Sequence, residues 1–153
     1  MLGPTSKIKL SLNLNSASQG SSIVIDSGFL KRTVSNILDN SIEAIGLKVG
    51  QVKVTLENQK NKVSIKFTDN GAGIEKELLP KLFKEGATFG KKSGQGLGLF
   101  TAKEFVSRNN GTIVIRSKKN WGTQIVFTLP RNQYEQTVPI ARKGTVHNLT
   151  TMS

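Results

Sequence analysis

Hydrophobic and polar residues alternate in several segments of the chain, and strict alternation is typical of strands that bury one face. In the first of these segments, residues 7–15, the apolar positions are Ile8, Leu10, Leu12 and Leu14. We expect this segment to form a half-buried strand. The same alternation predicts further strands at residues 52–56 and 63–67, and residues 113–117 and 123–129 are expected to form the last two strands.

Turn residues connect these strands in pairs. Lys60-Asn61 suits a turn, so the second and third strands are predicted to form an antiparallel hairpin. Asn120-Trp121-Gly122 predicts a turn between the last two strands, and Pro130 ends the pattern. The chain therefore contains two predicted hairpins in addition to its first strand.

A helical period replaces the alternation between these strands. One helix is predicted over residues 28–45, where Asp26 or Ser27 would cap it. A short helix over residues 75–83 is interrupted by Pro80, and a third helix opens at residue 96 and ends at residues 109–111. The resulting order, βαββ, a loop-rich segment and then αββ, predicts an α+β two-layer sandwich, a mixed sheet with helices on one face.

The helix over residues 28–45 carries two different faces. Its apolar residues cluster on one side, while Asn36, Asn40 and Glu43 form a polar stripe about 60° wide on the other. Asparagine is unfavourable inside helices because its side chain competes for backbone hydrogen bonds. The stripe is therefore either a functional surface or an ordinary solvated face, and this helix alone does not decide between them.

Two glycine-containing segments follow the hairpin. Asp69 ends the third strand and leads into Asn70-Gly71-Ala72-Gly73-Ile74, and residues 94–98, Gly-Gln-Gly-Leu-Gly, open the third helix. Residues 84–95 hold three glycines and three lysines, a composition typical of a mobile loop. An Asp at a strand end is often only a turn former, and glycines at a helix start can reflect tight packing, although exposed amides there also bind anions.

These features also meet the requirements of a nucleotide site. Asp69 would accept a hydrogen bond from the adenine amino group, and one carboxamide oxygen from Asn40 suffices for Mg²⁺, which keeps waters and phosphate oxygens as its other ligands. The sequence contains neither a P-loop nor the parallel βαβ pattern of a dinucleotide-binding fold.

Composition limits the other possibilities. The chain has 153 residues, no cysteine and one histidine, His147, which argues against disulfides, thiolate zinc sites and histidine-relay hydrolases. No secretory signal and no membrane segment are expected, so the sequence indicates a cytoplasmic protein or the cytoplasmic part of a membrane-bound sensor. The net charge of +12 is dispersed and fits a solvated basic surface; docking on acidic protein or nucleic acid would be an added property, and no specific nucleic acid is expected.

Four motifs resemble those of the GHKL ATPases (gyrase, Hsp90, histidine kinase and MutL), most closely the catalytic ATP-binding domain of bacterial sensor histidine kinases. The asparagine, first glycine, phenylalanine and second glycine boxes correspond to Asn36–Ser41, Asp69–Ile74, Leu82-Phe83 with Phe89, and Gly94–Leu99. The resemblance implies the Bergerat α/β sandwich over residues 7–130, preceded by a linker at 1–6 and followed by a tail of uncertain order at 131–153.

The resemblance also implies roles for individual residues. Asp69 would bind the adenine amino group with support from Thr123, Gly71 and Gly73 would let the backbone pass close to the base, and Asn40 would coordinate Mg²⁺. Residues 84–95 would form the ATP lid. The positions expected to take part in catalysis are Asn36, Asn40 and Lys91. The other positions assigned to nucleotide binding are Glu43, Ile74, Phe83, Phe89, Gly94, Gly96, Leu97, Gly98 and Leu99.

The resemblance finally implies an activity. Asn36 occupies the place of the catalytic glutamate of gyrase-like members, and without a carboxylate there, phosphoryl transfer to a protein side chain is favoured over ATP hydrolysis. The expected acceptor is a histidine on a dimerisation hairpin of the same or another protein, with a response regulator receiver domain as the next partner. His147 lacks a helical or acidic context and reads as an ordinary tail residue. The alternatives are an anti-sigma-factor-like serine kinase and a non-catalytic nucleotide-dependent binding module.

Overall fold

The computed structural model describes residues 7–15, 25–84 and 98–131 of the chain. These residues form five strands, two α-helices and one short 3₁₀ helix. In chain order the elements are β1 (Ile8–Leu14), α1 (Ser27–Ile45), β2 (Gly50–Gln59), β3 (Lys62–Asp69), the 3₁₀ helix (Leu79–Lys81), α2 (Gly98–Arg108), β4 (Thr112–Lys118) and β5 (Gly122–Pro130).

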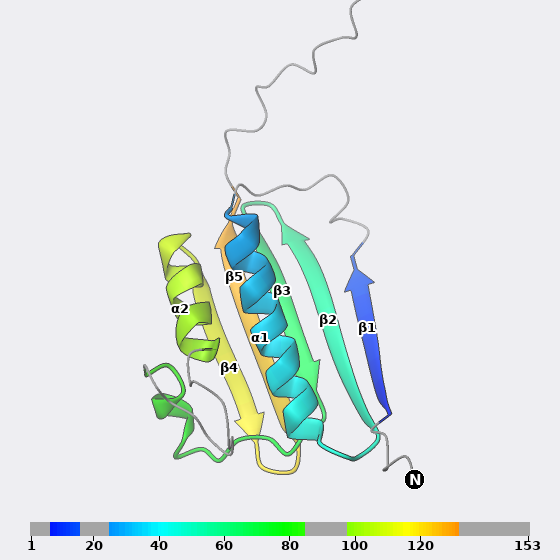
Figure 1. Ribbon diagram of the computed structural model, residues 1–153. Helices are drawn as coiled ribbons and strands as arrows, with labels where there is room; N and C mark the ends of the chain where they lie inside the picture. The colour runs from blue at the N-terminus through cyan, green and yellow to red at the C-terminus, as the bar shows by residue number, and fades with distance from the viewer. Residues whose placement is uncertain (1–6, 16–24, 85–97, 132–153) are drawn as a thin grey trace, which may run out of the picture.

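The strands form one mixed sheet in the order β1-β2-β3-β5-β4. β1 pairs with β2 in parallel, while the β2–β3, β3–β5 and β4–β5 pairs are antiparallel. Both α-helices lie on the same face of the sheet, α1 in front of its centre and α2 beside it, near β4 (Figure 1). The predicted two-layer α+β sandwich is confirmed.

Helix α1 begins and ends as its sequence indicates. The carboxylate of Asp26 accepts a hydrogen bond of 2.8 Å from the backbone N–H of Phe29, which caps the first turn. Gly46 follows the last turn with φ +64°, a conformation that favours glycine, and its N–H donates to the Ile42 carbonyl. Every fourth residue of the inner face is buried against the sheet: Thr33, Ile37, Ser41 and Ile45.

The hydrophobic core lies between the two helices and the central strands. Phe67 of β3 and Phe127 of β5 are almost fully buried, and their rings meet at a centroid distance of 5.5 Å and an angle of 59°. Phe105 of α2 stacks on Phe29 of α1 at 5.4 Å. The first contact joins β3 to β5 and the second joins α1 to α2, and all four rings belong to or pack against one core cluster.

The first strand differs from its prediction. β1 forms, but its alternating leucines are exposed: Leu10 by 62%, Leu12 by 64% and Leu14 by 62%. β1 is at the edge of the sheet, and in Figure 1 neither helix lies in front of it. The expectation of a half-buried strand was therefore wrong for the described residues, because alternation predicts a strand but not a helix to cover it.

The predicted helix over residues 75–83 was also wrong. Only Leu79–Lys81 is helical, as a single 3₁₀ turn with Pro80 at its start. The backbone hydrogen bonds here join residues three positions apart and replace the four-residue spacing of an α-helix. The Leu78 N–H donates to the Glu75 carbonyl, and the Lys81 N–H donates to the Leu78 carbonyl. Proline removes an N–H donor and clashes with the preceding turn, so an α-helix does not continue through it.

Both predicted hairpin turns are confirmed. β2 ends at Gln59 and β3 begins at Lys62, while Asn120 and Gly122 of the second turn adopt positive φ values of 62° and 111°. The predicted linker at 1–6 and nearly all of the tail at 131–153 lie outside the described residues, as does the loop at 84–95 except for Lys84.

Candidate functional site

Asp69 is the fixed point of the candidate site. It ends β3 directly opposite Thr123 of β5, and only 7% of the residue is exposed. Its Oδ1 accepts hydrogen bonds from the backbone N–H groups of Gly71, at 2.9 Å, and Thr123, at 3.2 Å. Its Oδ2 accepts a bond of 3.0 Å from the Ser41 hydroxyl on α1. Three elements therefore hold this carboxylate in one orientation.

The loop after Asp69 packs closely on the elements around it. A Cβ atom at Gly71 would lie 2.7 Å from the Cβ of Ala44, and the N–H of Ala72 donates to the Ala44 carbonyl at 2.8 Å. Gly73 has φ +70°, and a Cβ there would overlap the Lys118 carbonyl oxygen. Both glycines are required by close backbone contacts, which hold the loop between the end of α1 and the β4–β5 turn.

Ser117 links this loop to Thr123. Its hydroxyl accepts from the Ile74 N–H at 2.8 Å, donates to the Gly122 carbonyl at 2.8 Å, and lies 2.9 Å from the Thr123 hydroxyl. Because Ser117 has one hydrogen and donates it to a carbonyl, Thr123 is the donor in the third contact. Thr123 is thereby held with its own hydrogen directed at Ser117.

The asparagine stripe of α1 lies against the start of α2. Asn36 and Asn40 are half-buried, and a Cβ atom at Gly98 would lie 3.5 Å from both the Cβ of Asn36 and the Nδ2 of Asn40. The first turn of a helix presents N–H groups without intrahelical partners and the positive end of the helix dipole. The first turn of α2, with Gly98 and Leu99, thus lies beside two carboxamides, and its N–H groups are suited to an anion.

Two other predicted residues lie beside this arrangement. Glu43 is exposed on α1, about one turn beyond Asn40. Phe83 is half-buried and contacts α2, since the Nζ of Lys103 lies 5.5 Å from the centre of its ring. The segment that follows the glycine loop is therefore attached to α2 as well as to the sheet.

An exposed ion pair also holds the segment that follows the glycine loop. The Nζ of Lys119 lies 2.7 Å from a carboxylate oxygen of Glu75. Hydrogen bonding to Lys119 and its positive charge lower the pKa of Glu75, and the same contact raises the pKa of Lys119. This pair connects the loop after Ile74 to the β4–β5 turn.

The structure brings the predicted residues into two groups. Gly71 and Thr123 donate to the carboxylate of Asp69, with Gly73 further along the same loop, and Asn36, Asn40 and Gly98 form the second group beside the start of α2. Some predicted residues lie outside the described part of the chain: Phe89, Lys91, Gly94, Gly96 and Leu97.

Sequence reasoning missed the roles of two serines, Ser41 and Ser117. Each occupies a core-facing position of its element, Ser41 one helical turn after Ile37 and Ser117 two residues after Ile115. A small hydroxyl residue in an otherwise apolar row was the available signal, because buried hydroxyls normally have hydrogen-bond partners.

Two features are absent from the described residues. No helix there is long and apolar enough to cross a membrane. The same residues contain no group of three or more His, Cys, Asp or Glu side chains that could hold a metal ion.

Comparison with protein families identifies this arrangement. Residues 25–133 match the model of the histidine kinase-, DNA gyrase B- and HSP90-like ATPases. The chain belongs to this family. The match covers α1, both glycine-containing segments and the closing strands, so it includes every residue of the candidate site.

Sensor kinases are prominent among the relatives. The chain is 37% identical to the sensor histidine kinase YvrG of Bacillus subtilis over 107 residues, which are 67% of this chain and 18% of the relative. It is 34% identical to the signal transduction histidine-protein kinase AtoS of Escherichia coli over 120 residues, 77% of this chain and 19% of the relative. The chain thus spans about a fifth of the length of these relatives.

Solved structures agree with the fold. The catalytic domain of the histidine kinase ThkA, in a nucleotide-free form, superposes with a TM-score of 0.70 at 26% identity, covering 81% of this chain and 80% of that one. A mycobacterial sensor histidine kinase, MprB, gives a TM-score of 0.68 at 26% identity, with coverage of 80% and 81%. The fold of the chain is that of histidine kinase catalytic domains.

Proposed function

We propose that this domain binds Mg-ATP between α1 and α2 and transfers the γ-phosphoryl group to a histidine on a separate dimerisation hairpin. The observation that carries the proposal is the anchoring of Asp69. Its buried carboxylate accepts hydrogen bonds from two backbone N–H groups and the Ser41 hydroxyl, on the sheet face that carries the helices. Such a fixed acceptor suits the amino group of adenine.

The base would lie against the glycine loop. Gly71 and Gly73 have no side chains, so the backbone of the loop packs directly against Ala44 and Lys118. The base would lie against this backbone, beside Asp69. Thr123, whose hydrogen points at Ser117, would offer its oxygen lone pairs to the base or to a bridging water. Ile74, whose N–H is held by Ser117, would supply apolar contact at the edge of the ring.

The phosphates would lie at the other group. The carboxamide of Asn40 lies beside Gly98 at the start of α2. Its oxygen would be a hard ligand for Mg²⁺, which takes phosphate oxygens and water as its other ligands. When bound, the ion would neutralise phosphate charge. The N–H groups at Gly98 and Leu99 would bind phosphate oxygens and orient the γ-phosphoryl group.

Asn36 supports transfer to a protein rather than hydrolysis. A carboxamide cannot act as a general base on water, whereas catalysis of phosphoryl transfer depends mainly on positioning and charge neutralisation. Asn36 lies beside Gly98, one turn before Asn40, and would orient the triphosphate. Lys91 would add a positive charge on the γ-phosphate from the predicted lid.

The acceptor hairpin and a response regulator receiver domain would be partners of this domain in a cytoplasmic two-component system. Support comes from relatives whose names describe sensor histidine kinases. Those names do not favour the alternatives of an anti-sigma-factor-like serine kinase or a non-catalytic binding module.

A titration followed by a transfer assay tests the proposal. Calorimetry of the wild-type chain with ATP, with and without Mg²⁺, should show binding of one nucleotide per chain. Incubation with Mg-ATP labelled on the γ-phosphate and a purified sensor-kinase hairpin should then give acid-labile, base-stable phosphohistidine. A hairpin with its histidine replaced by glutamine is the matched control. Binding without any phosphohistidine on hairpins from several sensor kinases would contradict the transfer step.

A further inference from the structure

Ser41 occupies an unusual place in α1. It belongs to the row of α1 residues that faces the sheet, together with Ile37 and Ile45, and only 4% of it is exposed. A hydroxyl group at such a position loses its contacts with water, so it needs a partner inside the protein. The partner here is Asp69, whose Oδ2 accepts the Ser41 hydrogen at 3.0 Å.

Another buried hydroxyl of the same row provides a contrast. Thr33, two helical turns earlier, is fully buried, and its Oγ1 has no hydrogen-bond partner among the described residues. Both residues sit on the inner face of α1, but only the Ser41 hydroxyl donates to a residue of the candidate site. The Ser41 contact is therefore specific to its neighbour and not a general property of polar residues in this row.

The hydrogen bonds of Asp69 determine which of its oxygens is available. A carboxylate has about four acceptor sites, two on each oxygen. Oδ1 already accepts from the N–H groups of Gly71 and Thr123, while among the described residues Oδ2 accepts only from Ser41. The remaining acceptor site lies on Oδ2, the oxygen that Ser41 contacts.

We propose that Ser41 is a positioning residue for the nucleobase: it holds Oδ2 of Asp69 so that the remaining acceptor site receives the amino group of adenine. The inference rests on the proposed function, because it requires ATP at this site. Ser41 touches Asp69 and acts on the base through it.

The same hydrogen-bond count predicts base selectivity. Ser41 has one hydrogen and donates it to Asp69, so both groups act only as acceptors toward a ligand. A purine with an amino group at position 6 supplies the donor that this pair needs. A purine with a carbonyl group there would place an acceptor against acceptors, which costs the hydrogen bond and leaves the carbonyl unpaired.

The test combines one protein variant with one ligand variant. Calorimetry measures the Kd of wild-type and Ser41→Ala protein for ATP and for purine riboside triphosphate, which lacks the 6-amino group. We expect Ser41→Ala to weaken ATP binding about tenfold and to change binding of the analogue by less than about twofold. The coupling arises because Ser41 can aid only a ligand that uses the Oδ2 acceptor site.

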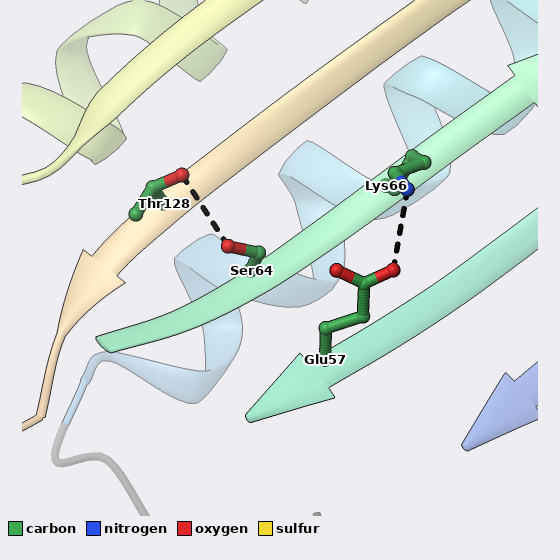
Figure 2. Close-up of polar contacts among 4 residues, drawn as sticks. All are labelled: Glu57, Ser64, Lys66 and Thr128. Carbon is green, nitrogen blue, oxygen red and sulfur yellow. Dashed lines mark hydrogen bonds and ion pairs between the residues drawn. The ribbon is translucent and has the colours of Figure 1, made fainter. Parts of the chain in front are cut away.

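A second serine provides the matched control. Ser64 of β3 is also buried, 7% exposed, and its hydroxyl lies 3.4 Å from the Thr128 hydroxyl on the sheet face opposite the helices (Figure 2). Ser64→Ala removes the same atom and a longer hydroxyl contact, and Ser64 makes no hydrogen bond to Asp69. We expect it to change ATP affinity by less than about twofold, and melting curves of both variants report whether each remains folded.

A conservative variant covers the case in which Ser41→Ala fails to fold. Ser41→Cys keeps the size of the side chain and a weak hydrogen donor, and it should bind ATP with an affinity between those of wild type and Ser41→Ala. Equal losses for ATP and the analogue, or unchanged ATP affinity in the folded variants, would overturn the positioning role while leaving the proposed function intact. Wild-type protein that binds no ATP would overturn both.

Discussion

The centre of the sheet and its β1 edge have the same sequence pattern and different environments. Phe67 alternates with polar residues in β3 and is 1% exposed, whereas Leu12 alternates in the same way in β1 and is 64% exposed. The two helices lie over the centre and beside it, and leave β1 uncovered (Figure 1). Alternation of apolar and polar residues thus predicts that a strand forms, while the burial of its side chains depends on which element packs against the strand.

The candidate site lies entirely in the part of the sheet that the helices cover. Its residues come from the second half of α1, the end of β3 and the starts of β5 and α2, and none comes from β1. Asp69 continues the inward-facing row of Phe67, and Thr123 lies in the row of Phe127. The core therefore positions these two polar groups, because each lies two residues from a packed side chain on the same strand face.

Truncating one side chain in each region should produce the largest difference. Phe127→Ala removes a fully buried ring that contacts Phe67, and it should lower the free energy of unfolding by about 3–5 kcal/mol. Leu12→Ala removes a mostly exposed side chain and should cost less than about 1 kcal/mol. Urea denaturation followed by far-ultraviolet circular dichroism measures both. Equal losses would show that β1 is covered in solution and would break the comparison.

Within the covered region, Asp69→Asn should produce the next largest effect. Both oxygens of the Asp69 carboxylate accept hydrogen bonds, three in all. The asparagine amide replaces one of these oxygens by an NH₂ group, which would face a donor instead of accepting from it. We expect ATP affinity to fall by about 100-fold, equivalent to about 2.7 kcal/mol, both with and without Mg²⁺. Calorimetry measures the affinity, and a melting curve confirms that the variant is folded. A loss seen only with Mg²⁺ would place Asp69 at the phosphates and contradict the assignment.

Much of this arrangement could be predicted from the sequence. The helical period placed Asn36 and Asn40 on one stripe, and strand alternation followed by glycines placed Asp69 at a strand end. These predictions succeeded because they depend on local geometry, with repeats of 3.6 and 2 residues. The resemblance to a known family then identified the segments that meet in the fold.

The rest depends on contacts between distant residues. Ser41 and Asp69 are 28 positions apart, and Ser117 reaches Ile74 across 43 positions. Nothing local to either serine reveals its partner. The exposed leucines of β1 were mispredicted for the same reason, since their exposure depends on where α1 packs and not on their own spacing.

Asn40→Ala should have a smaller and conditional effect. The carboxamide lies beside Gly98 at the start of α2, in the group proposed to hold the phosphates and Mg²⁺. We expect ATP affinity to fall about tenfold with Mg²⁺ present and to change by less than about twofold in its absence. Calorimetry with and without excess chelator separates the two conditions. An equal loss in both would mean that Asn40 binds the nucleotide directly, which would remove the distinction between the two groups of the site.

The smallest effect is expected at the exposed pair of Glu75 and Lys119. Lys119 lowers the pKa of Glu75, so the contact stabilises the folded state above the ordinary carboxyl pKa of 4.5 and loses that effect as the pH falls through the lowered value. Lys119→Ala should return the Glu75 pKa toward its ordinary value, while the melting temperature at pH 7 changes by less than about 2 °C, because solvent screens exposed pairs. Carboxyl carbon shifts of Glu75, followed by NMR across pH 2 to 7, measure the first effect. A large melting shift would mean that this tether, and not the core alone, positions the glycine loop.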